Sequence, residues 1–200
     1  MCFLSIFPLA GMLIIVLLII IKVIVLRKKG IEVSPKETGK KPASLLVYPV
    51  FLLLFLIWLC GLAESALHLK QPLLPAFMTQ KLIESFMLNT AGAAFILLSV
   101  LVMLFALLHF KSSLRFGMSK NNRGKLITTG IFSHTRNPFF LSIDLFFVGQ
   151  AMVFPAPLFI AMAVLAAVSI HLFILKEEKF MQVHYHDEYP HYSQKVRRYF

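Results

Sequence analysis

The sequence predicts an all-α, polytopic integral membrane protein with five transmembrane helices. Of its 200 residues, 58% are hydrophobic, and the mean hydropathy is +0.81. Soluble domains are about 45–50% apolar, so this composition is that of a membrane protein. The chain also contains several apolar runs of about the 20 residues that a helix needs to cross a hydrocarbon core of about 30 Å.

Polar or proline-containing segments separate the five predicted spans. The spans cover residues 4–26, 45–63, 86–110, 139–154 and 158–175. A polar linker at 30–44 follows the first span, and 64–85 is expected to form a loop with a short interfacial helical turn. Pro155 and Pro157 divide one 37-residue apolar stretch into the last two spans, because proline interrupts a helix and the stretch is too long for one span. Trp58 is expected at the outer membrane interface.

The distribution of basic residues predicts the orientation. Segments 27–41, 111–136 and 176–200 hold six, six and five of the 20 Lys and Arg residues, whereas the intervening loops hold only Lys70 and Lys81. Cytoplasmic loops carry such an excess, so we expect an outside N-terminus, beginning with an uncleaved helix, and a cytoplasmic C-terminus. The same interpretation accounts for the net charge of +11 without nucleic-acid binding. Cys2 and Cys60 indicate no disulfide or metal framework.

Two polar segments, 126–140 and 176–192, flank the predicted hairpin of the last two spans. The hairpin returns the chain to the same face of the membrane, so any chemistry is expected where these segments meet. We therefore divide the chain into an N-terminal membrane scaffold, 1–110, and a C-terminal region, 111–200, that carries the candidate site.

Arg136, Asn137 and Pro138 form the first motif. Proline is favoured at the first position of a helix, and Asn137 is a suitable N-cap. A helix N-terminus beside an arginine can bind an anion. The alternative is a capped helix with an interfacial arginine.

Glu177 and Glu178 form the second motif, at the predicted end of the last span. Carboxylates at a helix C-terminus interact unfavourably with the helix macrodipole, so a pair at this position suggests a functional role. They could bind hydroxyl groups or a cationic ligand. Alternatively, Lys176 and Lys179 could compensate a solvated helix end.

The remaining polar residues give weaker indications of a functional site. Asp144 lies inside a predicted span, where a carboxylate is costly, so it is either a site residue or neutralised by a neighbour such as His171. His184, His186 and His191 have no convincing metal-ligand spacing and are interpreted as surface residues, so no metal site is predicted.

Taken together, the segment LITTGIFSHTRNPFF, two short spans, a Glu-Glu pair and the tail DEYPHY resemble the isoprenylcysteine carboxyl methyltransferase and phospholipid methyltransferase superfamily. The likeness covers about residues 114–198. The residues that match the motifs of that superfamily are Gly130, Ile131, Phe132, Arg136, Asn137, Pro138, Glu177, Glu178, Tyr189 and Tyr192. Phe140 stands where the family usually has tyrosine, and His186 where it usually has glycine.

The resemblance implies an enzyme that uses S-adenosylmethionine, bound in a cytoplasmic pocket of the C-terminal half. The acceptor would be lipophilic and enter from the bilayer: a prenylated cysteine carboxylate, a phospholipid amine, or a small lipophilic thiol, acid or amine. Arg136 and Glu178 are the candidate catalytic residues. By position, the resemblance assigns donor contacts to Leu126, Ile127, Phe132, Arg136, Asn137, Pro138, Phe140 and Glu177, with Tyr189 and Tyr192 closing the pocket.

Two alternatives remain. Membrane sterol reductases, which use NADPH, are similar around the Arg-x-Pro segment but do not share the Glu-Glu pair, and five spans are few for them. The chain could also be a catalytically inactive membrane scaffold that keeps the fold.

Overall fold

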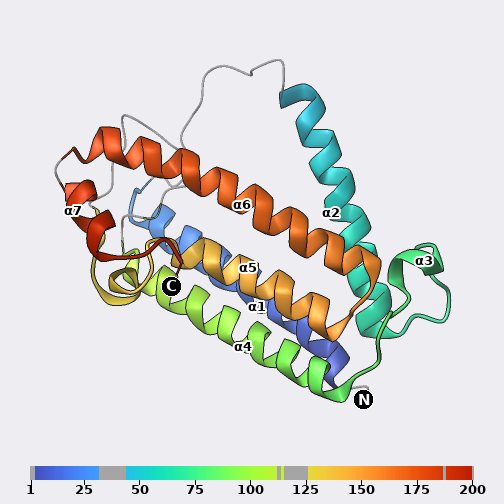
Figure 1. Cartoon of the computed structure of the whole chain (residues 1–200). Helices are drawn as coiled ribbons and strands as arrows, with labels where there is room; N and C mark the ends of the chain where they lie inside the picture. The colour runs from blue at the N-terminus through green and yellow to red at the C-terminus, as the bar shows by residue number, and fades with distance from the viewer. Residues whose placement is uncertain (1–2, 32–43, 112–113, 115–125, 187, 200) are drawn as a thin grey trace.

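The computed structural model describes residues 3–31, 44–111, 114, 126–186 and 188–199, and within these ranges the regular structure is helical throughout. Figure 1 shows long helices running side by side, with α7 and the C-terminus at one end of the bundle. The elements are η1 (Leu4–Ile6), α1 (Phe7–Lys28), α2 (Ser44–Leu67), α3 (Ala76–Thr79), α4 (Phe86–His109), η2 (Gly130–Ser133), α5 (Pro138–Val153), α6 (Pro157–His184) and α7 (Glu188–Lys195). The all-α class is confirmed. Most of the predicted 30–44 linker, most of the 111–125 segment and Cys2 lie outside the described residues.

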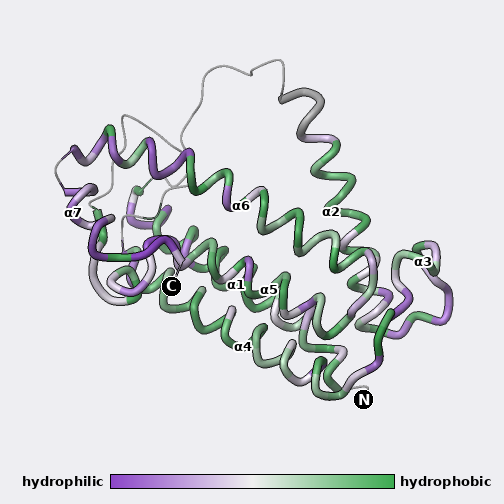
Figure 2. Tube along the Cα trace, in the orientation of Figure 1, coloured by the Kyte–Doolittle hydropathy of each residue, from purple (hydrophilic) through white to green (hydrophobic). Residues whose placement is uncertain are grey.

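Five apolar helices match the five predicted spans. Four of them, α1 with η1, α2, α4 and α6, are long and apolar enough to cross a membrane. The fifth, α5, has 16 residues and is therefore about 24 Å long, slightly less than a hydrocarbon core. Figure 2 shows that hydrophobic residues follow the long helices and that hydrophilic residues gather toward the ends of the bundle.

Helices α4 and α5 pack closely because two glycines face each other. A Cβ added to Gly92 would lie 2.6 Å from the carbonyl oxygen of Gly149, and one added to Gly149 would lie 2.8 Å from that of Gly92. Small residues allow such close approach between membrane helices. Further along, the buried Ser99 hydroxyl donates to the Ser142 carbonyl at 2.6 Å. The start of α5, which carries the arginine motif, is thereby held against α4.

The predicted hairpin is confirmed, because α5 ends at Val153 and α6 begins at Pro157. Phe154 and Phe159 lie on either side of the turn, are each 1% exposed, and pack against one another with ring centroids 5.5 Å apart. α6 thus returns antiparallel to α5, and both helices reach the end of the bundle that holds α7 (Figure 1).

Two expectations about the helices are wrong. Trp58 does not lie at an interface: it is 4% exposed, contacts the rings of Phe146 and Phe147, and donates from Nε1 to Gln150 Oε1 at 2.9 Å. The last apolar helix does not end near Leu175, since α6 continues to His184. Its Glu-Glu pair therefore lies inside the helix, where the macrodipole argument does not apply.

Candidate functional site

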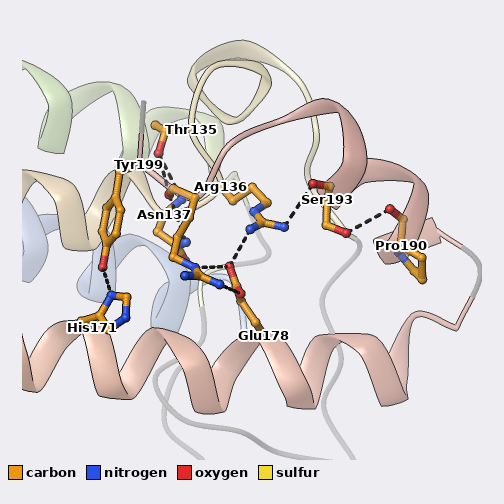
Figure 3. Close-up of polar contacts among 9 residues, drawn as sticks. Thr135, Arg136, Asn137, His171, Glu178, Pro190, Ser193 and Tyr199 are labelled. Atoms are coloured by element: carbon orange, nitrogen blue, oxygen red, sulfur yellow. Dashed lines mark hydrogen bonds and ion pairs between the residues drawn. The ribbon is translucent and has the colours of Figure 1, made fainter.

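A buried ion-pair network lies at the α7 end of the bundle. Glu178 of α6 is 8% exposed. Its Oε1 lies 3.0 Å from Nη2 of Arg136, and its two oxygens accept hydrogen bonds from Nε and Nη2 of Arg198 at 3.0 and 2.7 Å (Figure 3). A buried carboxylate requires such partners, and this one has two cations, so the three side chains together carry one positive charge.

The chain segment after α7, residues 196–199, holds this network in place, and we call it the C-terminal strap. It crosses the residues that precede α5. The backbone N–H of Arg136 donates to the Arg197 carbonyl at 3.1 Å, and the Thr135 hydroxyl donates to the Arg198 carbonyl at 3.1 Å. Asn137 Nδ2 donates to the same carbonyl at 3.3 Å. Asn137 occupies the N-cap position of α5 but makes no side-chain cap hydrogen bond, so its predicted capping role is wrong and its amide holds the strap instead.

Helix α7 supplies two buried tyrosines. The Tyr192 hydroxyl donates to the Phe132 carbonyl at 2.6 Å, and the Phe132 ring contacts that of Phe110 edge-on at 4.9 Å. Tyr189 packs against Tyr192, and the Arg136 guanidinium lies 6.0 Å from its ring centroid. Burial is the main reason that the pKa of Tyr189 is raised to about 12. Burial also raises the pKa of Tyr192, so both hydroxyls stay protonated at neutral pH.

The structure brings most of the predicted site residues together. Pro138 is fully buried at the first position of α5. Glu177 is half-buried and precedes Glu178 directly in α6, which places it beside the network. Phe140 instead packs on Phe173 of α6, with ring centroids 5.3 Å apart. The remaining two predicted donor contacts are Leu126 and Ile127. They precede η2 and are partly buried.

Sequence reasoning missed Arg198. Its guanidinium makes the only bidentate contact to Glu178 among the described residues, and its carbonyl anchors the loop before α5. The sequence does contain an indication of this partner. A buried carboxylate needs a cationic partner, and the tail contains two arginines, Arg197 and Arg198. The sequence alone does not say which of the two turns inward.

The fold and the site define a polytopic membrane protein with a charged cluster where two hairpin-linked helices meet the C-terminal strap. The family model described as phospholipid methyltransferase matches residues 87–188, from the start of α4 to the start of α7. The chain belongs to this family, and it is a membrane methyltransferase of a lipid-modifying family. No curated protein and no solved structure is similar enough to the chain to match it.

Proposed function

We propose that the protein is an S-adenosylmethionine-dependent methyltransferase of the isoprenylcysteine carboxyl methyltransferase type that acts on a lipophilic acceptor. The observation that carries the proposal is the buried Arg136–Glu178–Arg198 network. It joins both motifs of the resemblance, and it lies in the C-terminal region, 111–200. This region would hold the donor, and the preceding helices would act as membrane scaffold.

The residues present fit the charged end of such a donor. Nε of Arg136 is buried and has no hydrogen-bond partner among the described residues. An unpaired buried donor is costly, and a carboxylate would satisfy it. The N-terminus of α5 follows directly, and its helix dipole favours the same anion. Arg136 and the start of α5 would therefore hold the donor carboxylate.

The other predicted contacts fit the remaining parts of the donor. Glu177 can accept hydrogen bonds from ribose hydroxyls or from the donor amino group. Phe132 and Phe140 are the aromatic side chains that would line an adenine ring. Glu178 would act by fixing Arg136, since its ion pair with that residue sets the direction of the guanidinium.

Bound S-adenosylmethionine supplies an activated methyl group. The chain's contribution would be to orient the reactants and to exclude water, which are the main protein effects on a direct transfer. The strap and α7 suit this role, because they cover the loop before α5 through the Tyr192 and Arg198 contacts. A lipophilic acceptor would enter from the bilayer, and the basic-residue bias would place the site on the cytoplasmic side. The acceptor candidates are a prenylated cysteine, a phospholipid, and a small lipophilic molecule.

Calorimetric titration of S-adenosylmethionine into detergent-purified protein tests the proposal. Arg136→Ala and Glu177→Ala should each weaken binding by about 30-fold or more, because each removes one side of a desolvated charged hydrogen bond. Lys176→Ala, next to Glu177 but exposed, is the matched control and should bind as the parent does. Binding of NADPH in place of S-adenosylmethionine would favour the reductase, and binding of neither would favour an inactive scaffold.

A further inference from the structure

The segment between α2 and α4, residues 68–85, contains the short helix α3 and lies at the end of the bundle opposite α7 (Figure 1). We call this segment the cap. Glu64, in the last turn of α2, holds it through both carboxylate oxygens. Its Oε2 accepts hydrogen bonds from the backbone N–H groups of Leu73 and Leu74 at 2.9 and 3.0 Å, and its Oε1 accepts one from the Thr79 hydroxyl at 2.8 Å. One carboxylate therefore fixes the path of the cap.

Backbone donors further along the cap are also paired within the protein. The N–H groups of Met78 and Gln80 donate to cap carbonyls at 2.9 and 2.8 Å, and that of Leu82 donates to the Pro155 carbonyl in the α5–α6 turn at 2.8 Å. The two prolines of the cap have no N–H group to satisfy. An aqueous loop can leave such donors to water, whereas backbone at membrane depth has to pair them inside the protein. At these positions the cap meets the stricter requirement.

Large apolar side chains lie on both sides of the cap. Leu74 and Met78 pack against the core of the bundle. On the outward side, six apolar side chains of the cap and the first turn of α4 are 53% to 84% exposed: Leu73, Phe77, Leu82, Ile83, Phe86 and Met87. Exposed apolar surface of this kind marks contact with another apolar phase, and a segment that is apolar on both sides is typical of a membrane environment.

The length of α5 places the cap at membrane depth. α5 starts beside the charged network at one surface and is about 24 Å long, whereas a hydrocarbon core is about 30 Å thick. The turn after α5 therefore lies about 6 Å below the opposite surface. Val153, Phe154 and Ala156 at this turn are each at most 1% exposed. The Leu82 hydrogen bond and the Lys81 ammonium, 5.4 Å from the Phe154 ring centroid, hold the cap over them.

We propose that the cap is inserted into the membrane leaflet at this end of the bundle, where lipid acyl chains contact its outward apolar side chains and Glu64 holds its backbone in place. Lipid is the occupant because the outward surface continues along α4, whose exposed apolar side chains extend as far as Leu108. Lys70 and Glu84 are exposed and would lie among the headgroups. The inference is independent of methyl transfer, since the ion-pair network lies at the other end of the bundle.

Tryptophan fluorescence in proteoliposomes tests the position of the cap. Phe77→Trp exchanges one exposed aromatic side chain for another, and the signal of the parent, whose one tryptophan is the buried Trp58, is subtracted. Lipids brominated near the headgroup should quench the added tryptophan more than lipids brominated near the chain ends, and aqueous iodide should quench it little. Leu98→Trp, in the middle of α4, should be quenched more by the chain-end bromines. Gln194→Trp, exposed on α7, should respond to iodide and not to bromine.

Two outcomes for the Phe77→Trp reporter would overturn the insertion of the cap into lipid. Quenching by iodide to the same extent as in Gln194→Trp, without quenching by bromine, would mean that the cap lies in water. Protection from both quenchers would mean that protein covers the outward surface, as in an interface with a second copy of the chain.

The role of Glu64 is tested in the same reporter background. Glu64→Ala removes the acceptor of two backbone N–H groups, so the cap should loosen, and the Phe77→Trp reporter should become more accessible to iodide and less quenched by brominated lipid. Glu84→Ala removes an exposed carboxylate from the same cap and is the matched control, which should leave both quenching profiles unchanged. Identical profiles in the two variants would refute the role of Glu64.

Discussion

The guanidinium of Arg198 donates to both carboxylate oxygens of Glu178, from Nε at 3.0 Å and from Nη2 at 2.7 Å. Bidentate pairs of this kind are among the stronger hydrogen-bonded contacts in proteins and fix the geometry of both partners. Because the Arg198 carbonyl also accepts hydrogen bonds from Thr135 and Asn137, one residue ties α6 to the loop before α5. The strap is therefore part of the site.

Replacing Arg198 by alanine should destabilise the protein and weaken S-adenosylmethionine binding. The change leaves Glu178 with Arg136 as its cationic partner among the described residues, and hydrogen bonds to charged groups contribute about 1.5–3 kcal/mol. Thermal unfolding in detergent and donor titration would measure the two effects. Arg197→Ala is the matched control, because that side chain is exposed and the contact with Arg136 is made by the Arg197 backbone carbonyl. Equal behaviour of the two variants would contradict a structural role for the Arg198 side chain.

Replacing Tyr192 by phenylalanine removes one hydroxyl and leaves the Phe132 carbonyl without that donor. A hydrogen bond of this kind contributes about 0.5–1.5 kcal/mol, and an unsatisfied buried partner raises the cost. We expect a lower free energy of unfolding, measured by denaturant titration in detergent. Tyr48→Phe, at a side chain that is 71% exposed, should have no effect. Equal losses in both variants would mean that the contact with Phe132 contributes nothing specific.

Features that depend on local sequence could be predicted. Pro155 and Pro157 predict the hairpin because proline interrupts the helix at its own position. The hairpin then brings Arg136 and Glu178 to one end of the bundle. The extension of α6 was missed because Lys and Glu end an apolar run without ending a helix, for which both have good propensity.

Features that depend on the three-dimensional path of the chain could not be predicted. Trp58 is buried because Gln150, 92 residues away, offers an acceptor for its indole N–H. The Asn137 side chain makes no capping bond and instead donates from Nδ2 to the Arg198 carbonyl, 61 residues away. In both cases the local preference was overridden by a partner that no local pattern identifies.

Reporter fusions at the two termini should give opposite readouts. Five spans would place the two ends on different sides, and the basic-residue bias predicts an outside N-terminus. The experiment also tests whether α5 crosses the membrane despite its 16 residues. A fusion in the loop between α5 and α6 should report the same side as the N-terminus. Identical readouts at the two termini would mean an even number of spans.

Replacing Gly92 by alanine should separate α4 from α5 and thereby disturb the site at a distance. The new Cβ would lie 2.6 Å from the Gly149 carbonyl oxygen and 2.8 Å from the Val153 backbone nitrogen, and backbone atoms cannot move aside as a flexible side chain can. Overpacking of this kind costs about 1–3 kcal/mol, which unfolding in detergent would detect. Because α5 begins with the residues that follow Arg136, donor affinity should fall as well. Ala94→Leu, at an exposed position on the same helix, is the matched control and should change neither quantity. If Gly92→Ala were as stable as the parent, α4 and α5 would have enough space at this contact for an added methyl group.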